Sequence, residues 1–214
     1  MRRADPYVLF LAVVGIAFVW SAIRPMDYGV WFFELSLGLA GVLFLVATRR
    51  RFPFSGLVYA LGAVHFVILA CGAKYTYAEM PLFNWLRDAL DLSRNHFDRV
   101  GHFFQGVVPA MLARELLLRT SPLKPGKWLF TLCVAVALAI SALYELFEWR
   151  YAVTFGGQRA ADFLGSQGDI WDAQEDMLMA FIGAVVAQLF LSRLHDRQIA
   201  QLGVRSNTAM GKSH

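Results

Sequence analysis

Charged residues and cysteines are both scarce in this chain of 214 residues. Asp, Glu, Lys and Arg together make up 17% of the sequence, whereas hydrophobic residues make up 57%. A composition with so little charge excludes an ordinary water-soluble domain of this length. The two cysteines, Cys71 and Cys133, do not have the spacing of metal ligands, so they do not indicate a cysteine-based metal site.

Several motifs that would identify an enzyme class are also absent. The chain has no GxxxxGK or GxGxxG loop that could cradle a nucleotide, and it has no HExxH motif of a zinc peptidase. Internal repeats and low-complexity tracts are missing as well. Function must therefore be inferred from the hydrophobic pattern and from the few ionisable residues.

The hydrophobic residues come in blocks long enough to cross a bilayer, which takes about 20 residues in a helix. Together the blocks use more than half of the chain, so no separate soluble domain fits. We predict an all-α fold, a polytopic membrane helical bundle with six transmembrane helices, formed by residues 1–203 and followed by a polar tail, 204–214. The predicted spans are residues 7–23, 30–47, 55–73, 97–118, 128–149 and 173–192.

The basic residues predict the orientation of the bundle, because Lys and Arg in short loops stay on the cytoplasmic side. They gather before the first span and after every second span, which places both termini in the cytoplasm. The pI of about 9.3 therefore reflects topology, and we expect no nucleic-acid partner. The basic residues are Arg2 and Arg3, then Arg49, Arg50 and Arg51, then Arg119, Lys124 and Lys127, and finally Arg193, Arg197, Arg205 and Lys212.

Acids and histidines crowd the places where the last three spans begin or end. Charged groups beside lipid are costly unless they pair, face water or hold an ion. The predicted topology places most of them at the outer side of the membrane, so they form the leading candidate site. The residues are Asp98, His102, Glu145, Glu148, Asp162, Asp169, Asp172, Glu175 and Asp176.

Helical spacing puts many of these residues on shared faces. Steps of three or four residues bring side chains to the same side of a helix. The helix dipole also favours acids at a helix N-terminus, which explains part of the Asp169 and Asp172 placement without a function. The residues separated by three or four positions are Asp98 with His102, Glu145 with Glu148, and the series Asp169, Asp172 and Asp176.

Carboxylates gathered on one side of a bundle repel unless a positive group lies among them. Arg99, Arg150, Arg159, a protonated histidine or a divalent cation could supply that charge. The cluster could thus be a metal site, a structural salt-bridge network with the arginines, or a solvated rim of unrelated charges. Oxygen and imidazole ligands from several helices suit Zn, Mn or Fe. The predicted metal ligands are Asp98, His102, Glu145, Glu148, Asp172 and Asp176.

Three functions follow from these alternatives. The first is a metal-dependent hydrolase or transferase acting on a lipid or lipid-linked substrate at the outer leaflet, with Glu148 or Asp169 as the general base. The second is a small-ion or proton-coupled transporter, in which His65, Arg114 and Glu115 continue a path inward. The third is a structural or accessory membrane protein. Whether the chain is an enzyme, and its oligomeric state, stay open at this point.

Other polar and aromatic residues have simpler explanations. His65 lies in the middle of its span, where a lone histidine is more often a packing residue than a ligand. Tyr75, Tyr77, Trp85 and Trp149 lie where an interfacial aromatic belt is expected.

Four sequence runs carry a resemblance to a known family. The runs are KYTYAEMPLF, NHFDRVGHFFQGVVPAMLARE, YELFEW and QGDIWDAQEDM. They resemble the YjdF family, bacterial inner-membrane proteins classed as a domain of unknown function, over roughly residues 55–190. The resemblance implies a six-span protein of the bacterial inner membrane and supplies no activity. It also implies that His96, Asp98, His102, Glu115, Glu145, Glu148, Asp169, Asp172 and Asp176 belong to the family's motifs.

Overall fold

All regular structure in the part of the chain described by the computed structural model is helical. The described residues are 5–157, 164 and 166–210, with side chains up to Leu202. The expectation of an all-α fold is thus confirmed for these residues. The elements are α1 (Pro6–Ala22), α2 (Tyr28–Thr48), α3 (Gly56–Tyr75), the short 3-10 helix η1 (Tyr77–Glu79), α4 (Pro81–Ala89), α5 (Phe97–Thr120), α6 (Lys127–Phe155) and α8 (Asp172–Met210).

Polar capping residues set where the first three helices begin. The Asp5 carboxylate accepts a hydrogen bond from the Tyr7 N–H, and the Asp27 carboxylate accepts bonds from the N–H groups of Gly29 and Val30. The Ser55 side chain serves α3 in the same way. Each cap satisfies backbone donors that have no partner within the helix, so an apolar run can start at a defined residue.

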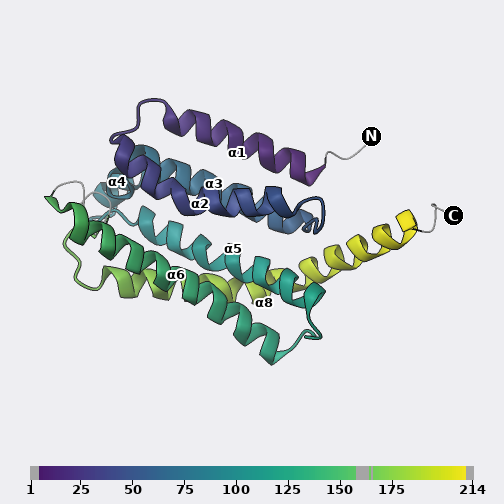
Figure 1. Cartoon of the computed structure of the whole chain (residues 1–214). Coiled ribbons are helices and arrows are strands. Elements are labelled where there is room, and N and C mark those ends of the chain that lie inside the picture. The colour runs from purple at the N-terminus through teal and green to yellow at the C-terminus, as the bar shows by residue number, and fades with distance from the viewer. Residues whose placement is uncertain (1–4, 158–163, 165, 211–214) are drawn as a thin grey trace.

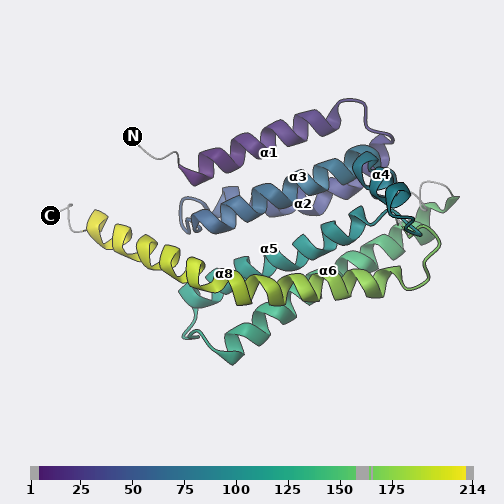
Figure 2. The ribbon, with the colours of Figure 1, turned by 180° about the vertical axis from the view of Figure 1, so that it is seen from behind.

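The long helices form a bundle in which their axes run in broadly similar directions (Figure 1). Helices α1, α2 and α3 lie together on one side, and α5, α6 and α8 lie together on the other. Helix α5 is central, because it packs against α8, α6 and α3. Both termini lie at one end of the bundle and α4 lies at the other, as the reverse view also shows (Figure 2). We name these the termini end and the cluster end.

Among the described residues, four helices are long and apolar enough to cross a membrane. They are α2, α3, α6 and the stretch of α8 from Asp172 to Leu202, while α1 is apolar but has only 17 residues. Helix α5 has the length of a span but also carries buried charges, so composition alone does not identify it as one. The six-span count and the cytoplasmic placement of the termini stay predictions.

Helices α5 and α8 cross at very short range. A Cβ atom placed on Gly106 of α5 would lie 1.9 Å from the Ala180 carbonyl oxygen, and one on Gly183 of α8 would lie 2.0 Å from the Phe103 carbonyl oxygen. Small residues let helix backbones approach this closely in membrane proteins. The crossing brings the first turns of α8 against the first turns of α5.

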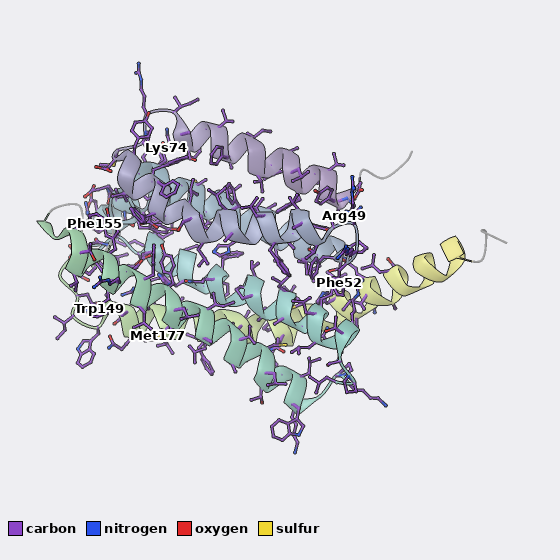
Figure 3. The ribbon with its side chains drawn as sticks, viewed as in Figure 1. Arg49, Phe52, Lys74, Trp149, Phe155 and Met177 are labelled. Atoms are coloured by element: carbon purple, nitrogen blue, oxygen red, sulfur yellow. The ribbon has the colours of Figure 1, made fainter. Side chains whose placement is uncertain are left out.

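The aromatic residues near the cluster end divide into two groups. Trp149 and Trp85 are exposed, at 59% and 63%, as an interfacial belt requires, and Trp149 lies at the cluster end with Lys74 (Figure 3). Tyr77 does not belong to the belt, because only 6% of it is exposed. The backbone turns sharply at Thr76, whose φ is 55°. This turn brings the Tyr77 ring over α3 and α5 at Gly72 and Gly101, where no side chain blocks it.

Candidate functional site

The predicted cluster forms at the cluster end of the bundle, where α5, α6 and α8 meet. Asp98 and His102 come from α5, Glu145 and Glu148 from α6, and Asp172 and Asp176 from α8. Most of these side chains are well buried: Asp98, His102, Glu148, Asp172 and Asp176 are at most 8% exposed. The packing of the three helices therefore brings together groups that the sequence separates by tens of residues.

His102 is the centre of the inner part of the cluster. Its Nε2 lies 3.4 Å from Asp98 Oδ1 and 3.8 Å from Asp176 Oδ2, and its Nδ1 lies 3.6 Å from Glu145 Oε1. All three separations exceed the 2.7–3.2 Å typical of a hydrogen bond to nitrogen. Asp98, His102 and Asp176 can offer ligand atoms that all lie within 4.8 Å of one another. These three residues are the best-formed candidate metal ligands in the described part of the chain.

Arg99 contacts one carboxylate oxygen of Asp98 and one of Asp176. Its Nη1 lies 3.9 Å from Asp98 Oδ2 and also bonds Asp176 Oδ1. The other oxygen of each carboxyl group faces His102. The guanidinium therefore orients both carboxyl groups so that their free oxygens point to one small space beside the imidazole.

An arginine-rich layer covers this inner part. Arg99 Nη2 lies 2.9 Å from Asp172 and 2.8 Å from Glu175, and Arg94 Nη1 lies 2.7 Å from Asp172 and 3.3 Å from Asp169. Such contacts are those expected of a structural salt-bridge network. They account for Asp169, Asp172 and Glu175 near the start of α8, whereas Glu145, which faces His102 from α6, has no arginine partner among the described residues.

Of the other two arginines considered as counter-ions, the structure describes only Arg150. The side chain of Arg150 is exposed, and among the described residues it forms no ion pair. Arg159 and the acid Asp162 lie outside the described residues. Arg94, which the sequence analysis did not name as a counter-ion, has that role through its contacts with Asp169 and Asp172.

Within the described part of the chain, neither Glu148 nor Glu34 is paired with an arginine. Glu148 lies close enough to Glu145, Asp98 and Glu34 for their charges to repel. Glu34 of α2 is only 1% exposed and accepts a 3.0 Å hydrogen bond from the Tyr144 hydroxyl. Sequence reasoning missed Glu34, although it is the only acid in the predicted span 30–47 and such residues are expensive in a membrane.

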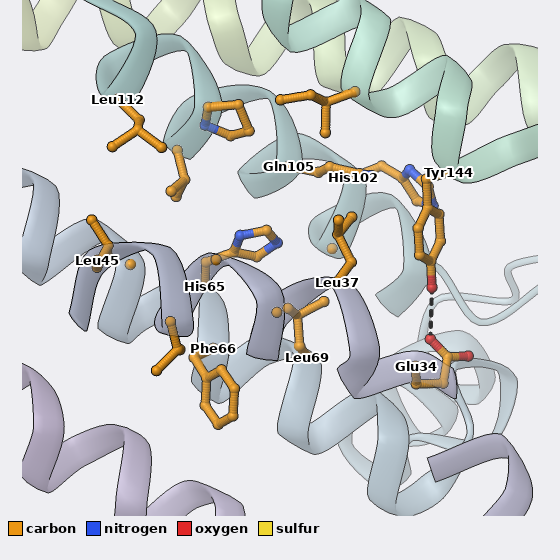
Figure 4. A pocket seen from close by; sticks show the side chains of 18 of the residues that line it. Glu34, Leu37, Leu45, His65, Phe66, Leu69, His102, Gln105, Leu112 and Tyr144 are labelled. Atoms are coloured by element: carbon orange, nitrogen blue, oxygen red, sulfur yellow. Dashed lines mark hydrogen bonds between the residues drawn. The ribbon is translucent and has the colours of Figure 1, made fainter. Parts of the chain in front are cut away.

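A cavity of about 180 Å³ adjoins the cluster and runs between α2, α3, α5 and α6. Asp98, His102, Glu34 and Tyr144 line its polar end. Most of the remaining wall is apolar, with His65 and Gln105 as exceptions (Figure 4). The cluster is thus accessible to a ligand that has a polar end and an apolar body.

The charges of the cluster also act on groups outside the spanning helices. Burial, together with the carboxyl groups of Glu34 and Asp98, raises the pKa of the Tyr77 hydroxyl. At His96, which precedes α5, partial burial and the charges of Arg94 and Arg99 lower the pKa of the imidazole. The carboxyl groups of the cluster therefore act on Tyr77, and the two arginines act on His96.

A second buried network lies at the termini end of α5. Glu115, which is fully buried, accepts bonds from the Ser55 N–H at 3.0 Å and from Arg119 at 2.7 Å, and it lies 2.9 Å from His195 Nε2. Arg114 instead bonds Asp196 at 2.7 Å. Arg114 and Glu115 therefore have different partners, because consecutive helical residues point in different directions.

Comparison with known proteins agrees with the membrane character of the chain. The sequence model of a family described as "Predicted membrane protein (DUF2238)" matches residues 6–197. The chain is 44% identical to the inner membrane protein YjdF of Escherichia coli (strain K12) over 205 residues, which cover 95% of this chain and 98% of that protein. No solved structure shows significant similarity to the chain.

Proposed function

Since the chain belongs to the DUF2238 family of predicted membrane proteins and is an integral protein of the inner membrane, we propose that its buried cluster binds one divalent metal ion and acts on a membrane lipid. The ligands are Asp98, His102 and Asp176. The proposal rests on one observation: one possible ligand atom from each of these residues lies within 4.8 Å of the other two, beside the cavity.

The spacing of the donor atoms suits a metal better than direct hydrogen bonds. Zinc holds nitrogen and oxygen ligands at about 2.0–2.2 Å in a tetrahedral arrangement, which puts neighbouring ligand atoms roughly 3.4 Å apart. The two distances from His102 Nε2, 3.4 Å and 3.8 Å, are close to that value. Oxygen and imidazole ligands also suit Mn and Fe, so the ligand set does not select one metal.

Charge balance supports the same conclusion. Asp98, Glu145 and Asp176 surround the His102 imidazole and Glu148 lies close to Glu145, whereas Arg99 contacts only the two aspartates. A protonated His102 would supply one positive charge, whereas a divalent ion supplies two. Buried carboxylates without a counter-charge are costly, so a divalent ion relieves more of the repulsion.

His102 would bind the ion through Nε2, since its Nδ1 faces Glu145. A metal-bound histidine commonly donates its other N–H to a carboxylate, which fixes the ring and its tautomer. Glu145 has that supporting position and is not needed as a direct ligand. Asp172 is held by Arg94 and Arg99, so its role would be to place the arginines.

A bound divalent ion would polarise an ester or phosphoryl oxygen and lower the pKa of a bound water. A general base must then take a proton from that water. Glu148 suits this role better than Asp169, because Glu148 is buried near the inner cluster whereas the Asp169 carboxylate contacts both arginines. We therefore propose a metal-dependent hydrolase or transferase of a lipid or lipid-linked substrate, with Glu148 as the base.

The test is the metal content of protein purified in detergent from cells grown with added Zn, Mn and Fe. We expect about one ion per chain in the wild type and a loss of most of it in His102→Ala and Asp176→Asn. His65→Ala is the matched control, because it removes a histidine that lines the same cavity away from the ligands. A wild-type protein without stoichiometric metal would overturn the proposal in favour of the structural salt-bridge network. Unchanged metal in folded His102→Ala protein would place the ion elsewhere.

A further inference from the structure

The cavity beside the cluster has polar atoms in its apolar part that lack a partner. The Gln105 side chain is 5% exposed, and neither its Nε2 nor the Nε2 of His65 has a hydrogen-bond partner in the described structure. Both residues line the cavity, and the His65 ring points from α3 toward α5 (Figure 4). Buried polar groups are nearly always bonded, so two unpartnered atoms in one cavity point to a missing ligand group.

The cavity is elongated along the helices. On α2 its lining runs from Glu34 to Leu45, which at 1.5 Å per residue corresponds to roughly 16 Å. On α5 it runs from Asp98 to Leu112. The polar groups lie toward one end and aliphatic side chains line the other. A lipid molecule has the same order of groups along its length.

The cavity is closed at the cluster end and open at its side farther along α2. At the cluster end α2 meets α6 through Phe33, whose ring centroid lies 4.6 Å from that of Tyr151, and through the bond between Glu34 and Tyr144. Farther along α2, the cavity-lining residues Leu37 and Gly41 are exposed at the outer surface of the bundle. Entry is therefore lateral, from the side that a membrane would cover.

The volume limits how much of a ligand can be enclosed. A cavity of roughly 150 Å³ accommodates a molecule of the size of benzene, so the 180 Å³ here holds only the first carbons of a chain. The rest must leave through the lateral opening. This suits a membrane lipid, whose remaining chain would stay in the bilayer.

We propose that this cavity binds one ester-linked acyl chain of a membrane lipid. The ester carbonyl accepts a hydrogen bond from Gln105 Nε2 and a second one from His65, the first methylenes lie along α2 toward Leu45, and the head group faces His102. The proposal names the substrate class of the proposed enzyme and in that respect rests on the proposed function. Binding of the chain itself requires no metal, so each can fail without the other.

The test uses two photoreactive phosphatidylethanolamines that carry a diazirine on the acyl or alkyl chain, one ester-linked and one ether-linked. Each is added to the full-length protein in liposomes, and crosslinked peptides are mapped by mass spectrometry after irradiation. We expect the ester lipid to label the stretches of α2 and α5 that line the cavity several-fold more than the ether lipid. Gln105→Leu should remove this preference for the ester.

Gly41→Phe should reduce labelling of the cavity by both lipids several-fold, because a Cβ at Gly41 meets no atom within 4 Å and the ring can fill the space. Gly15→Phe is the matched control, since Gly15 of α1 has equally free surroundings and does not line the cavity.

Labelling that is spread evenly over exposed helix faces, or that persists in Gly41→Phe, would overturn the proposal. Equal labelling by ester and ether lipids would overturn the role of Gln105 and His65. Repeating the experiment after EDTA treatment separates the outcomes, because labelling that persists without metal supports the cavity even if the metal proposal fails.

Discussion

His102 and Glu145 face each other across the interface of α5 and α6, with Nδ1 and Oε1 3.6 Å apart, and neither atom has another hydrogen-bond partner in the described structure. An imidazole N–H and a carboxylate at this separation need only a small shift to bond. The pair is therefore poised to close when the opposite nitrogen of His102 takes a ligand. We expect this closing to link the occupancy of the proposed metal site to the packing of α6.

Replacing Glu145 tests this link. We expect Glu145→Ala to weaken metal binding about 10–100-fold, the usual cost of losing a carboxylate that supports a ligating histidine. Glu145→Gln keeps an acceptor oxygen and should lose much less. Competition with a chelator of known affinity measures both. Equal affinity in Glu145→Ala and wild type would show that Glu145 does not support His102.

The close crossing of α5 and α8 predicts a stability defect from very small changes. Gly106→Ala and Gly183→Ala each place a methyl group about 2 Å from a backbone carbonyl oxygen, so the helices must separate. Overpacking of this kind costs about 1–3 kcal/mol of unfolding free energy. Gly15→Ala, which meets no atom within 4 Å, should be neutral or slightly stabilising. Thermal unfolding in one detergent compares the three variants, and unaltered stability of both crossing variants would contradict the packing described.

The buried network at the termini end predicts a structural role for Glu115. Glu115→Ala would leave His195, Arg119 and the Ser55 N–H without their shared acceptor. Breaking a buried ion pair from one side costs about 3–5 kcal/mol. We expect poor thermal stability, with normal metal content in whatever protein folds. Ion or proton flux in liposomes that requires Glu115, in protein of normal stability, would instead favour the transporter hypothesis.

His96 predicts a contribution to stability that depends on pH. Its pKa in the folded protein is lowered by partial burial and by Arg94 and Arg99, against a smaller opposing effect of Glu175. The unfolded chain, in which the pKa is about 6.5, then binds a proton more readily than the folded protein. The contribution is therefore complete above pH 6.5 and is lost as the pH falls below it. His96→Gln should make the unfolding midpoint less sensitive between pH 7.5 and pH 5.5, and an unchanged pH dependence would contradict this.

The predicted orientation places the candidate site at the outer face of the membrane. A fluorescent protein fused to the C-terminus should fluoresce, because both termini are expected in the cytoplasm. Alkaline phosphatase fused after Leu92, in the loop at the cluster end, should be active. Activity of a C-terminal phosphatase fusion would reverse the orientation and place the cluster on the cytoplasmic side.

The helices themselves were predictable because each hydrophobic block is continuous in the sequence. The predicted span 97–118 and helix α5 agree closely, as do the span 30–47 and helix α2. Helix α4 was not predicted, since its nine residues are amphipathic and too few to form a span.

The candidate site was predictable only in part. Asp98 and His102 share a helix face because they are four positions apart, which can be read from the sequence. The roles of Glu34 and Arg94 depend on contacts with residues 110 and 78 positions away. Local patterns contain no information about such partners.

The sequence by itself determined the all-helical membrane character of this protein, because composition and the length of apolar blocks depend on the chain alone. It also determined which ionisable residues stand in costly positions. Only the tertiary structure decided which of them meet, since that depends on how closely Gly106 and Gly183 allow α5 and α8 to approach. The same packing divides the acids between Arg99 and His102, and it creates the cavity into which His65 and Gln105 point.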